Sequence, residues 1–117
     1  MVSTKPHILV IVASASTNSS NLHIAQYVQG LLGPQFEVTV FEKLKSLPHF
    51  DAELSIANPP KEVKAFRELI QHSNGIIICT PEYFFSIPSV LKNAFEWCVS
   101  TTVFENKPLG KIGRAHV

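Results

Sequence analysis

The chain alternates between short, continuous apolar runs and longer segments in which apolar residues recur at helical spacing. Three runs are rich in β-branched residues: His7–Ala13, Phe36–Glu42 and Gly75–Thr80. Such runs are typical of strands that are buried on both faces of a parallel sheet. The sequence therefore predicts three strands, each followed by a segment long enough to cross back to the start of the next.

Three segments between and after these runs are expected to be helices. The first carries apolar residues at helical spacing and ends at Gly33–Pro34; these residues are Leu22, Ala25, Val28, Leu31 and Leu32. The second, Lys61–His72, places Val63, Phe66, Leu69 and Ile70 on one side. The third, Ser86–Val99, has Pro88 in its first turn, where a missing N–H does no harm. The segment between Glu42 and Lys61, which contains LPHFDAEL and Pro59–Pro60, is expected to be a long loop.

This β-α-β-α-β-α order predicts one α/β domain built as a doubly wound parallel sheet. Parallel strands need crossover connections, and these are nearly always right-handed. In such a sheet, ligands bind beyond the carboxyl ends of the strands, where the strand order reverses. The two segments that follow the first and third strands are therefore the candidate binding loops.

Composition narrows the class of protein. The 117 residues suffice for one modest core, and the formal net charge of +1 favours neither nucleic acid nor an acidic membrane as a partner. No apolar run reaches the roughly 18 residues of a transmembrane helix. The five histidines show no ligand spacing, so we expect no metal site. Cys79 and Cys98 lie in apolar stretches and are expected to be reduced core thiols, which fits a cytoplasmic protein.

The first candidate loop is polar and uncharged. Its hydrogen-bonding side chains are Ser14, Ser16, Thr17, Asn18, Ser19, Ser20 and Asn21. Free N–H groups and the positive dipole end of a helix N-terminus attract a phosphate, and hydroxyl and amide donors can complete the cradle. Neither G-x-G-x-x-G nor a P-loop lysine is present, so a monophosphate fits better than a dinucleotide or ATP. The alternative is that these residues only cap the helix and form a turn.

The second candidate loop brings aromatic residues directly after a buried strand. The backbone N–H groups of Glu82, Tyr83 and Phe84 are placed to meet the polar edge of a planar ring, and the Tyr83 ring to cover its face. The alternative is that these aromatics serve packing or an oligomer contact.

Both loops resemble motifs of the NADPH-dependent FMN reductases, a flavodoxin-like family that includes quinone, azo and chromate reductases. The family's phosphate loop reads G-S-x-R-x-x-S-x-N; Ala13, Ser14, Ser19 and Asn21 stand in that frame, with Ser16 in place of the arginine. The family's flavin loop reads T-P-E-Y-N-x-S-x-P-x-V-L-K-N-A-x-D-W. The matching residues here are Thr80, Pro81, Glu82, Tyr83, Ser86, Pro88, Val90, Leu91, Lys92, Asn93, Ala94 and Trp97. Phe84 replaces the asparagine and Glu96 the aspartate, and the segment Leu47–Asp51 resembles the family's linker before the second helix.

The resemblance implies a flavodoxin-like domain with strand order 2-1-3, the N-terminal part of a five-stranded 2-1-3-4-5 sheet. It implies FMN bound noncovalently, with its phosphate at Ser14, Ser16, Ser19 and Asn21 and its ring system against Pro81–Ser86. NAD(P)H is then the co-substrate, and the electrons pass to a small acceptor such as a quinone, an azo compound or a metal oxyanion. Because the flavin carries the chemistry, no protein residue is assigned a catalytic role.

Two residues that depart from the motifs affect the expected FMN site, and the third helix affects the expected oligomeric state. Losing the arginine at Ser16 removes a charge-assisted phosphate contact and should weaken FMN binding. Phe84 makes the pocket more apolar. The third helix is apolar beyond one stripe; the resemblance suggests a homodimer or homotetramer contact there, and burial within one subunit is the alternative.

The end of the chain is expected to differ from the rest. The domain is expected to span residues 1–111 and to be incomplete, with Lys107–Ile112 entering a fourth strand. The nucleotides ATC GGA AGA GCA CAC GTC, which occur within a common sequencing adapter, would translate to IGRAHV, the sequence of residues 112–117. We therefore expect a non-native tail that does not finish this strand. An incomplete sheet leaves apolar faces and an edge uncovered, which should lower solubility or FMN affinity.

Two other functions remain open from the sequence. The first is a flavodoxin-like electron carrier without NAD(P)H activity, against which the near-neutral charge speaks because such carriers are strongly acidic. The second is an interaction module that keeps the fold and has lost FMN.

Overall fold

The computed structural model describes residues 5–13, 20–81 and 89–114. Its strands are β1 (His7–Val12), β2 (Glu37–Phe41), β3 (Gly75–Pro81) and β4 (Leu109–Arg114). Its helices are α1 (Ser20–Leu32), the short 3-10 helix η1 (Leu44–Ser46), α2 (Ala52–Ala57), α3 (Lys61–Gln71) and α4 (Ser89–Glu96). The three predicted strands and the three predicted helices are all present.

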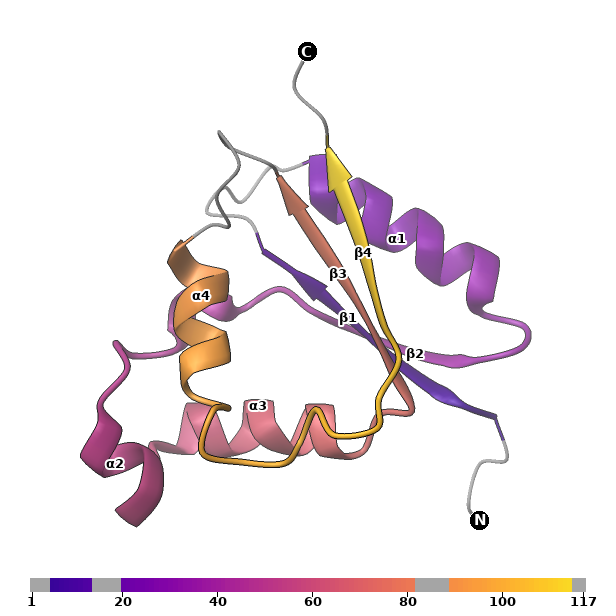
Figure 1. Ribbon diagram of the computed structural model, residues 1–117. Helices are drawn as coiled ribbons and strands as arrows, with labels where there is room; N and C mark the ends of the chain where they lie inside the picture. Colours follow the sequence, from indigo (N-terminus) through magenta and orange to yellow (C-terminus); the bar gives the residue numbers. More distant parts are fainter. Residues whose placement is uncertain (1–4, 14–19, 82–88, 115–117) are drawn as a thin grey trace.

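The strands of these ranges form one parallel sheet in the order β2-β1-β3-β4 (Figure 1). Ile8 pairs with Val38 on one side and with Gly75 on the other, so β1 is held between two neighbours. The predicted order 2-1-3 is confirmed, and β4 adds a fourth strand beside β3. The chain goes from β1 outward to β2 and then returns to β3 on the other side, which makes the β1–β3 boundary the point where the strand order reverses.

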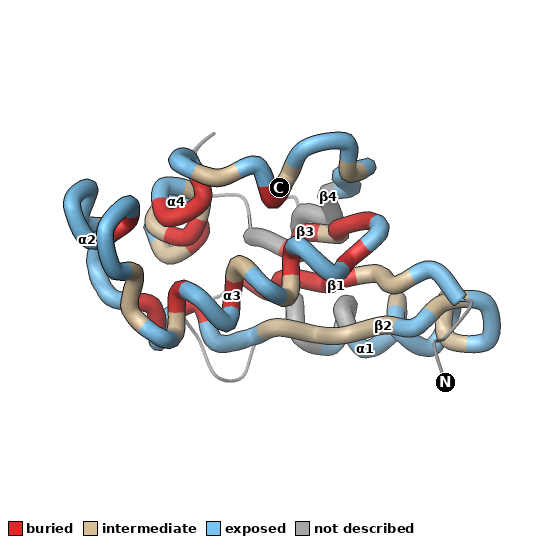
Figure 2. Tube along the Cα trace, turned by 90° about the horizontal axis from the view of Figure 1, so that it is seen from below, coloured by how far each residue is buried: buried red, intermediate tan, exposed pale blue. Residues whose placement is uncertain are grey.

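Helices cover both faces of the sheet, as the doubly wound prediction requires. One face carries the larger core, in which Leu9 and Ile11 of β1 pack with Phe66 of α3 and Leu91 of α4. The other face carries a smaller cluster around Val10, next to α1. Figure 2 shows buried positions concentrated in the central strands and in α3 and α4. The sheet therefore has a heavily covered face and a lightly covered one.

The predicted apolar faces are confirmed in part. Val63, Phe66 and Ile70 of α3 are buried, as their spacing predicted, and Leu69 is half-buried. Leu31 of α1 belongs to the predicted apolar set, but the structure leaves it 64% exposed. The lightly covered face does not reach far enough to bury the end of α1.

The prediction of a long loop between β2 and α3 is wrong, because this segment contains η1 and α2. Asp51 caps α2: its Oδ1 accepts hydrogen bonds from the Glu53 and Leu54 backbone N–H groups at 3.0 and 3.1 Å. Such an N-cap satisfies N–H groups that have no partner inside the helix. One capping side chain thus starts a helix too short to show an apolar period.

The prediction that residues 112–117 do not finish the fourth strand is wrong for the first three of them. Ile112 pairs with Cys79, Gly113 with Thr80 and Arg114 with Pro81. β4 therefore runs alongside β3 to the end of that strand. The non-native origin of these residues stays a prediction.

The predicted third helix ends three residues early, and Arg67 of α3 lies where it stops. The Arg67 Nε donates to the Trp97 carbonyl oxygen at 3.0 Å, and Nη2 donates to the Ser55 hydroxyl in α2 at 2.9 Å. A cation at a helix C-terminus is favourable because the last carbonyl groups carry partial negative charge. Beyond α4 the chain tightens into turns in which Cys98 N–H bonds to the Phe95 carbonyl at 2.9 Å. Arg67 thereby joins α2, α3 and the end of α4.

Candidate functional site

The two predicted binding loops leave the sheet from adjacent strand ends. Val12 of β1 pairs with Cys79 of β3, and the Ala13 N–H donates to the Cys79 carbonyl oxygen at 2.8 Å. Ala13 is buried, and the first loop begins at the next residue. Both loops therefore start at the reversal point of the sheet, where a doubly wound fold binds its ligands.

The structure places three of the predicted site residues. Ser20 and Asn21 open α1, and Pro81 is the last residue of β3. The start of α1 and the end of β3 both lie at the carboxyl edge of the sheet (Figure 1). The others lie outside the described residues: Ser14, Ser16, Ser19, Glu82, Tyr83, Phe84 and Ser86. The assignment of all ten to a flavin site stays a prediction.

The donors at this edge suit an anion. α1 and α4 both begin here, and neither has an acidic residue in its first turn. By contrast, α2 and α3 begin away from this edge and carry Glu53 and Glu62 in their first turns (Figure 1). A carboxylate in the first turn would occupy the positive end of the helix dipole and repel a phosphate. The residues at the carboxyl edge thus fit a phosphate-bearing cofactor such as FMN.

A hydrogen-bonded lock fixes α4 to the segment that precedes α2. The Asn93 side chain accepts from the Phe50 N–H at 2.8 Å and donates through Nδ2 to the Pro48 carbonyl oxygen at 2.9 Å. The Trp97 Nε1 donates to the same carbonyl oxygen at 2.8 Å. The Phe50 and Trp97 rings meet edge to face, with their centroids 5.3 Å apart. These contacts with Pro48 and Phe50 therefore hold α4, the helix that follows the predicted flavin loop, in place.

Sequence reasoning missed this role of Asn93 and Trp97, although both stand in the motif. The sequence does carry a signal for this role, because Leu47–Asp51 also resembles a segment of the FMN reductases. The structure shows that the two segments are hydrogen-bonded to each other. Part of the flavin-loop motif therefore fixes α4 to the segment before α2.

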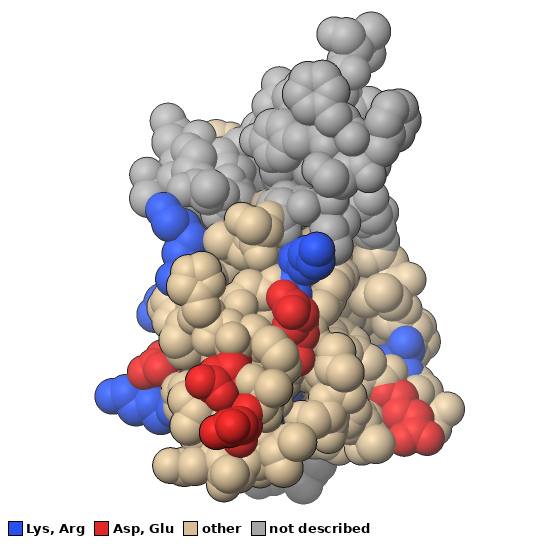
Figure 3. All heavy atoms as spheres, turned by 60° about the vertical axis from the view of Figure 1, so that its left-hand side comes forward, with Lys and Arg blue, Asp and Glu red and all other residues tan. Residues whose placement is uncertain are grey.

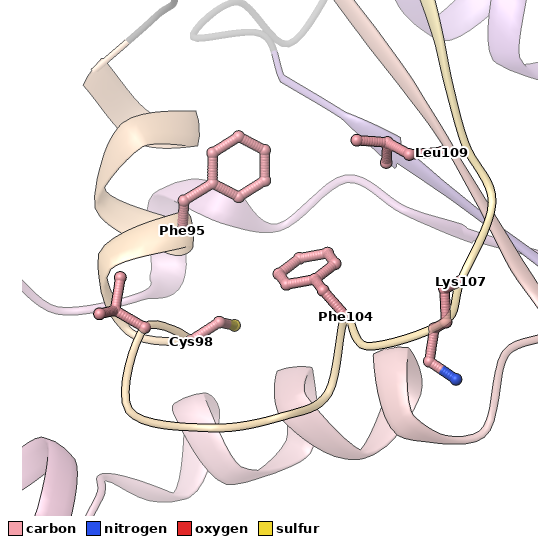
Figure 4. Close-up of a pocket in the computed structure, with 6 residues that line it drawn as sticks. Phe95, Cys98, Phe104, Lys107 and Leu109 are labelled. Carbon is pink, nitrogen blue, oxygen red and sulfur yellow. The ribbon is translucent and has the colours of Figure 1, made fainter.

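An apolar cavity of about 270 Å³ lies between the end of α4 and β4. Phe95 and Phe104 meet there edge to face, with their ring centroids 5.8 Å apart (Figure 4). Leu109 is 59% exposed at its rim, whereas the Lys107 Nζ is bonded to the Ser73 carbonyl oxygen at 2.7 Å. Leu91, Ala94 and Trp97 of the same segment are buried within this chain. Burial within one subunit thus accounts for most of its apolar residues, and the side facing β4 stays partly uncovered.

Both cysteines are free and buried, as predicted. Burial raises the pKa of the Cys98 thiol from 9.0 to about 11, although the Arg67 guanidinium lowers it somewhat. Burial also raises the pKa of Cys79. The thiolate is the reactive form of cysteine, so both thiols are poor nucleophiles at neutral pH.

We expect the raised pKa of Cys98 to make the protein less stable as the pH rises from about 9 to about 11. The unfolded chain releases this proton near 9.0, whereas the folded protein retains it, so the unfolded state binds fewer protons and unfolding becomes more favourable. Urea unfolding of the protein and of Cys98→Ala across this range measures the effect. The free energy of unfolding should fall less steeply in the variant; equal slopes would contradict the prediction.

Charged side chains do not gather by sign on the face of the molecule in Figure 3, where basic and acidic groups are interspersed. Within the described ranges, no helix is long and apolar enough to cross a membrane. In the same ranges, no three His, Cys, Asp or Glu side chains come together as a metal site would require.

The fold and the edge described above define a class: a doubly wound parallel α/β protein whose phosphate-compatible edge lies at the reversal point of its sheet. The chain belongs to the NADPH-dependent FMN reductase family, whose model matches residues 6–116. The family predicted from the two loop motifs is therefore confirmed, as is the flavodoxin-like fold.

Three relatives illustrate the match. The chain is 35% identical over 109 residues to the NADH:(hydroxy)cinnamate reductase subunit CrdA of Vibrio ruber, covering 92% of this chain and 53% of that protein. It is 33% identical to the NADH-dependent flavin reductase subunit 2 of Lactobacillus johnsonii, covering 93% and 60%. The structure of FerB, a flavoenzyme NAD(P)H:(acceptor) oxidoreductase from Paracoccus denitrificans, superposes with a TM-score of 0.84 at 28% identity, covering 94% and 61%. The chain thus spans a little over half the length of these relatives.

Proposed function

We propose that this protein is an FMN-dependent oxidoreductase that passes electrons from NAD(P)H through bound FMN to a small acceptor such as a quinone, an azo compound or a metal oxyanion. The observation that carries the proposal is the meeting of the two loop origins at Ala13 and Cys79, on the edge where α1 and α4 begin. Family membership supports the flavin, and the relatives' names support NAD(P)H as the electron donor.

The residues of this chain bind and orient the cofactor. The phosphate would be held by uncharged donors at the start of α1, namely Ser14, Ser16, Ser19, Ser20 and Asn21. Pro81, Glu82, Tyr83, Phe84 and Ser86 would line the ring system. FMN, when bound, supplies the chemistry by accepting a hydride from NAD(P)H and passing electrons on. Assembly into a homodimer or homotetramer and a cytoplasmic location also belong to this proposal.

The test combines flavin binding and turnover on the full chain. Titration of FMN against the protein, followed by flavin fluorescence, should show saturable binding. Addition of NADH or NADPH with a soluble quinone should then give steady oxidation of the nicotinamide that depends on FMN. Binding without nicotinamide oxidation would favour a flavin-binding module, and the absence of binding would favour an interaction module.

A further inference from the structure

Helix α1 presents an exposed face that carries no formal charge. The 13 residues Ser20–Leu32 include no Lys, Arg, Asp or Glu. Each of the other α-helices in the described ranges has at least one such residue, for example Glu53 in α2, Glu62 in α3 and Lys92 in α4. Because a helix that meets water on one side normally carries charged residues there, the composition of α1 is unusual for a face that meets only solvent.

Two large apolar side chains stand on this face of α1. Tyr27 is 68% exposed and Leu31, one turn later, is 64% exposed. The inner side of α1 packs on β1, β2 and β3, whereas α3 and α4 cover the opposite face of the sheet. The exposed residues recur at helical spacing and are called here the α1 face: His23, Gln26, Tyr27, Gly30 and Leu31. Enrichment in tyrosine and depletion of charge are typical of the centre of a protein–protein interface.

Gly30 is a second, separate indication that something approaches this face. A glycine within a helix lowers stability relative to alanine, so it is expected where the backbone or a close neighbour requires it. Neither reason holds within the subunit: Gly30 has no positive φ, and a Cβ at this position would meet no atom within 4 Å. Close approach of a group from another molecule would explain the missing side chain.

The α1 face of a second copy fits these features. A partner with charged groups would have to bury them without a counter-charge, which is costly, whereas a second α1 brings none. The shapes also match, since Tyr27 protrudes and Gly30, less than one turn away, leaves a gap. Two antiparallel copies related by a two-fold axis can place each Tyr27 over the Gly30 of the other, because such a contact is made twice by symmetry.

We propose that α1 binds α1 of a second copy of this chain as an antiparallel pair, with Tyr27 packed against Gly30 of the partner subunit. Leu31 then lies opposite Gln26 of the partner subunit. The inference goes beyond the proposed function, because it names a contact surface that requires neither FMN nor turnover. A test on the FMN-free chain therefore separates its failure from failure of the oxidoreductase assignment.

The size of the α1 face determines how strong this contact is. A helix of 13 residues is about 20 Å long and about 10 Å wide, so its face covers about 200 Å². A stable interface buries about 800 Å² on each partner. Self-association through α1 alone is therefore expected to be reversible and to depend on protein concentration.

The first experiment is analytical ultracentrifugation of the FMN-free full chain over a series of concentrations. We expect a reversible self-association step that Tyr27→Lys weakens by at least about tenfold, because the variant loses the ring and buries a charge in a neutral contact. Val99→Lys is the matched control, since Val99 is 79% exposed beyond the end of α4 and should leave this step unchanged. A monomer at every concentration, or equal weakening by both variants, would overturn the proposal. Weakening by Val99→Lys alone would also overturn it and would place the contact beside α4 instead.

Gly30→Gln distinguishes a contact from a purely local role of the glycine. Glutamine has the higher helix propensity, so the urea midpoint of the monomer should rise. The same side chain would occupy the gap that Tyr27 of the partner subunit fills, so self-association should weaken by at least about tenfold. A higher midpoint with unchanged self-association would contradict the proposal.

Disulfide trapping tests the antiparallel arrangement. Cys79 and Cys98 are buried, so an introduced surface cysteine is the one that reacts. A mixture of Gln26→Cys and Leu31→Cys proteins should cross-link readily, because these positions face each other across the pair. Two Gln26→Cys copies would hold their cysteines about 7.5 Å apart along the helix axis, beyond the reach of a disulfide. Cross-linking of Gln26→Cys alone that is as fast as in the mixture would overturn the arrangement.

Discussion

Replacement of Trp97 by alanine is expected to lower the free energy of unfolding by about 4 kcal/mol. The Trp97 side chain is fully buried, packs edge-on against Phe50 and donates a hydrogen bond to the Pro48 carbonyl oxygen. Truncation would leave a cavity that the fixed walls of α3 and α4 fill only in part, and large cavities in cores cost the most. Urea unfolding followed by circular dichroism measures the change.

Trp97→Phe keeps an aromatic ring at this position but removes the indole donor and part of the buried volume, so it should cost less than Trp97→Ala. The Pro48 carbonyl oxygen would keep its bond from Asn93 Nδ2, so loss of the indole donor should cost only about 1 kcal/mol. Ile56→Ala on α2 is the matched control: Ile56 is 78% exposed, and its truncation should change stability by less than about 0.5 kcal/mol. A Trp97→Ala effect as small as that of Ile56→Ala would show that the Trp97 contacts do not support the fold.

The lock around Pro48 links stability to the candidate site. Asn93 lies in α4 and Trp97 directly follows the helix, and both bond to a segment more than 40 residues earlier in the chain. Ser89, at the other end of this helix, follows directly on the predicted flavin loop. The bonds to Pro48 and Phe50 therefore fix the helix that the predicted flavin loop enters.

Much of the fold follows from local pattern. The β-branched runs of β1 and β3 reflect burial on both faces of the sheet, and the apolar stripe of α3 reflects burial on one side of a helix. Right-handed crossovers then limit the possible topologies, whereas the order 2-1-3 is implied by the resemblance to the FMN reductases. β4 was recognised only at its start, because Leu109–Arg114 holds two glycines and two charged residues and lies at an edge where few positions need to be apolar.

The short helices η1 and α2, between β2 and α3, show no apolar period in the sequence. α2 has six residues, of which Leu54 and Ile56 are 43% and 78% exposed, so no apolar stripe marks it. Its one signal is Asp51, a residue type that is equally common in turns. The end of α4 likewise could not be predicted, since it coincides with the bond from Arg67, which lies 30 residues away in the chain.

The sequence predicts a chemistry for the candidate site but not the contacts that hold its supporting helix. Serine and asparagine side chains after one strand and aromatics after another can be recognised in a linear sequence. The bonds from Asn93 to Pro48 and Phe50 cannot, because they join residues whose proximity depends on the finished fold. Residues that position a site are found from three-dimensional contacts, whereas residues that contact a ligand are often visible from their type.

Ser16→Arg is expected to tighten FMN binding by at least about tenfold, since a hydrogen bond to a charged group contributes about 1.5–3 kcal/mol and 1.4 kcal/mol is a factor of ten. Ser16 lies outside the described residues, and the prediction rests on the loop motif, in which arginine stands at this position. A guanidinium there would add a charge-assisted, two-pronged contact to a cradle otherwise made of neutral donors. Fluorescence titration of FMN against both proteins measures the change.

Riboflavin distinguishes a phosphate contact from a general effect. It has the ring system of FMN without the phosphate, so its affinity should be the same for Ser16→Arg and for the unchanged protein. Ser16→Gln, which adds length and donors without charge, should leave FMN binding within about threefold of the original. Equal tightening of riboflavin and FMN by Ser16→Arg would mean that residue 16 acts on the ring or on the fold, and the phosphate would then have to be held elsewhere than at the start of α1.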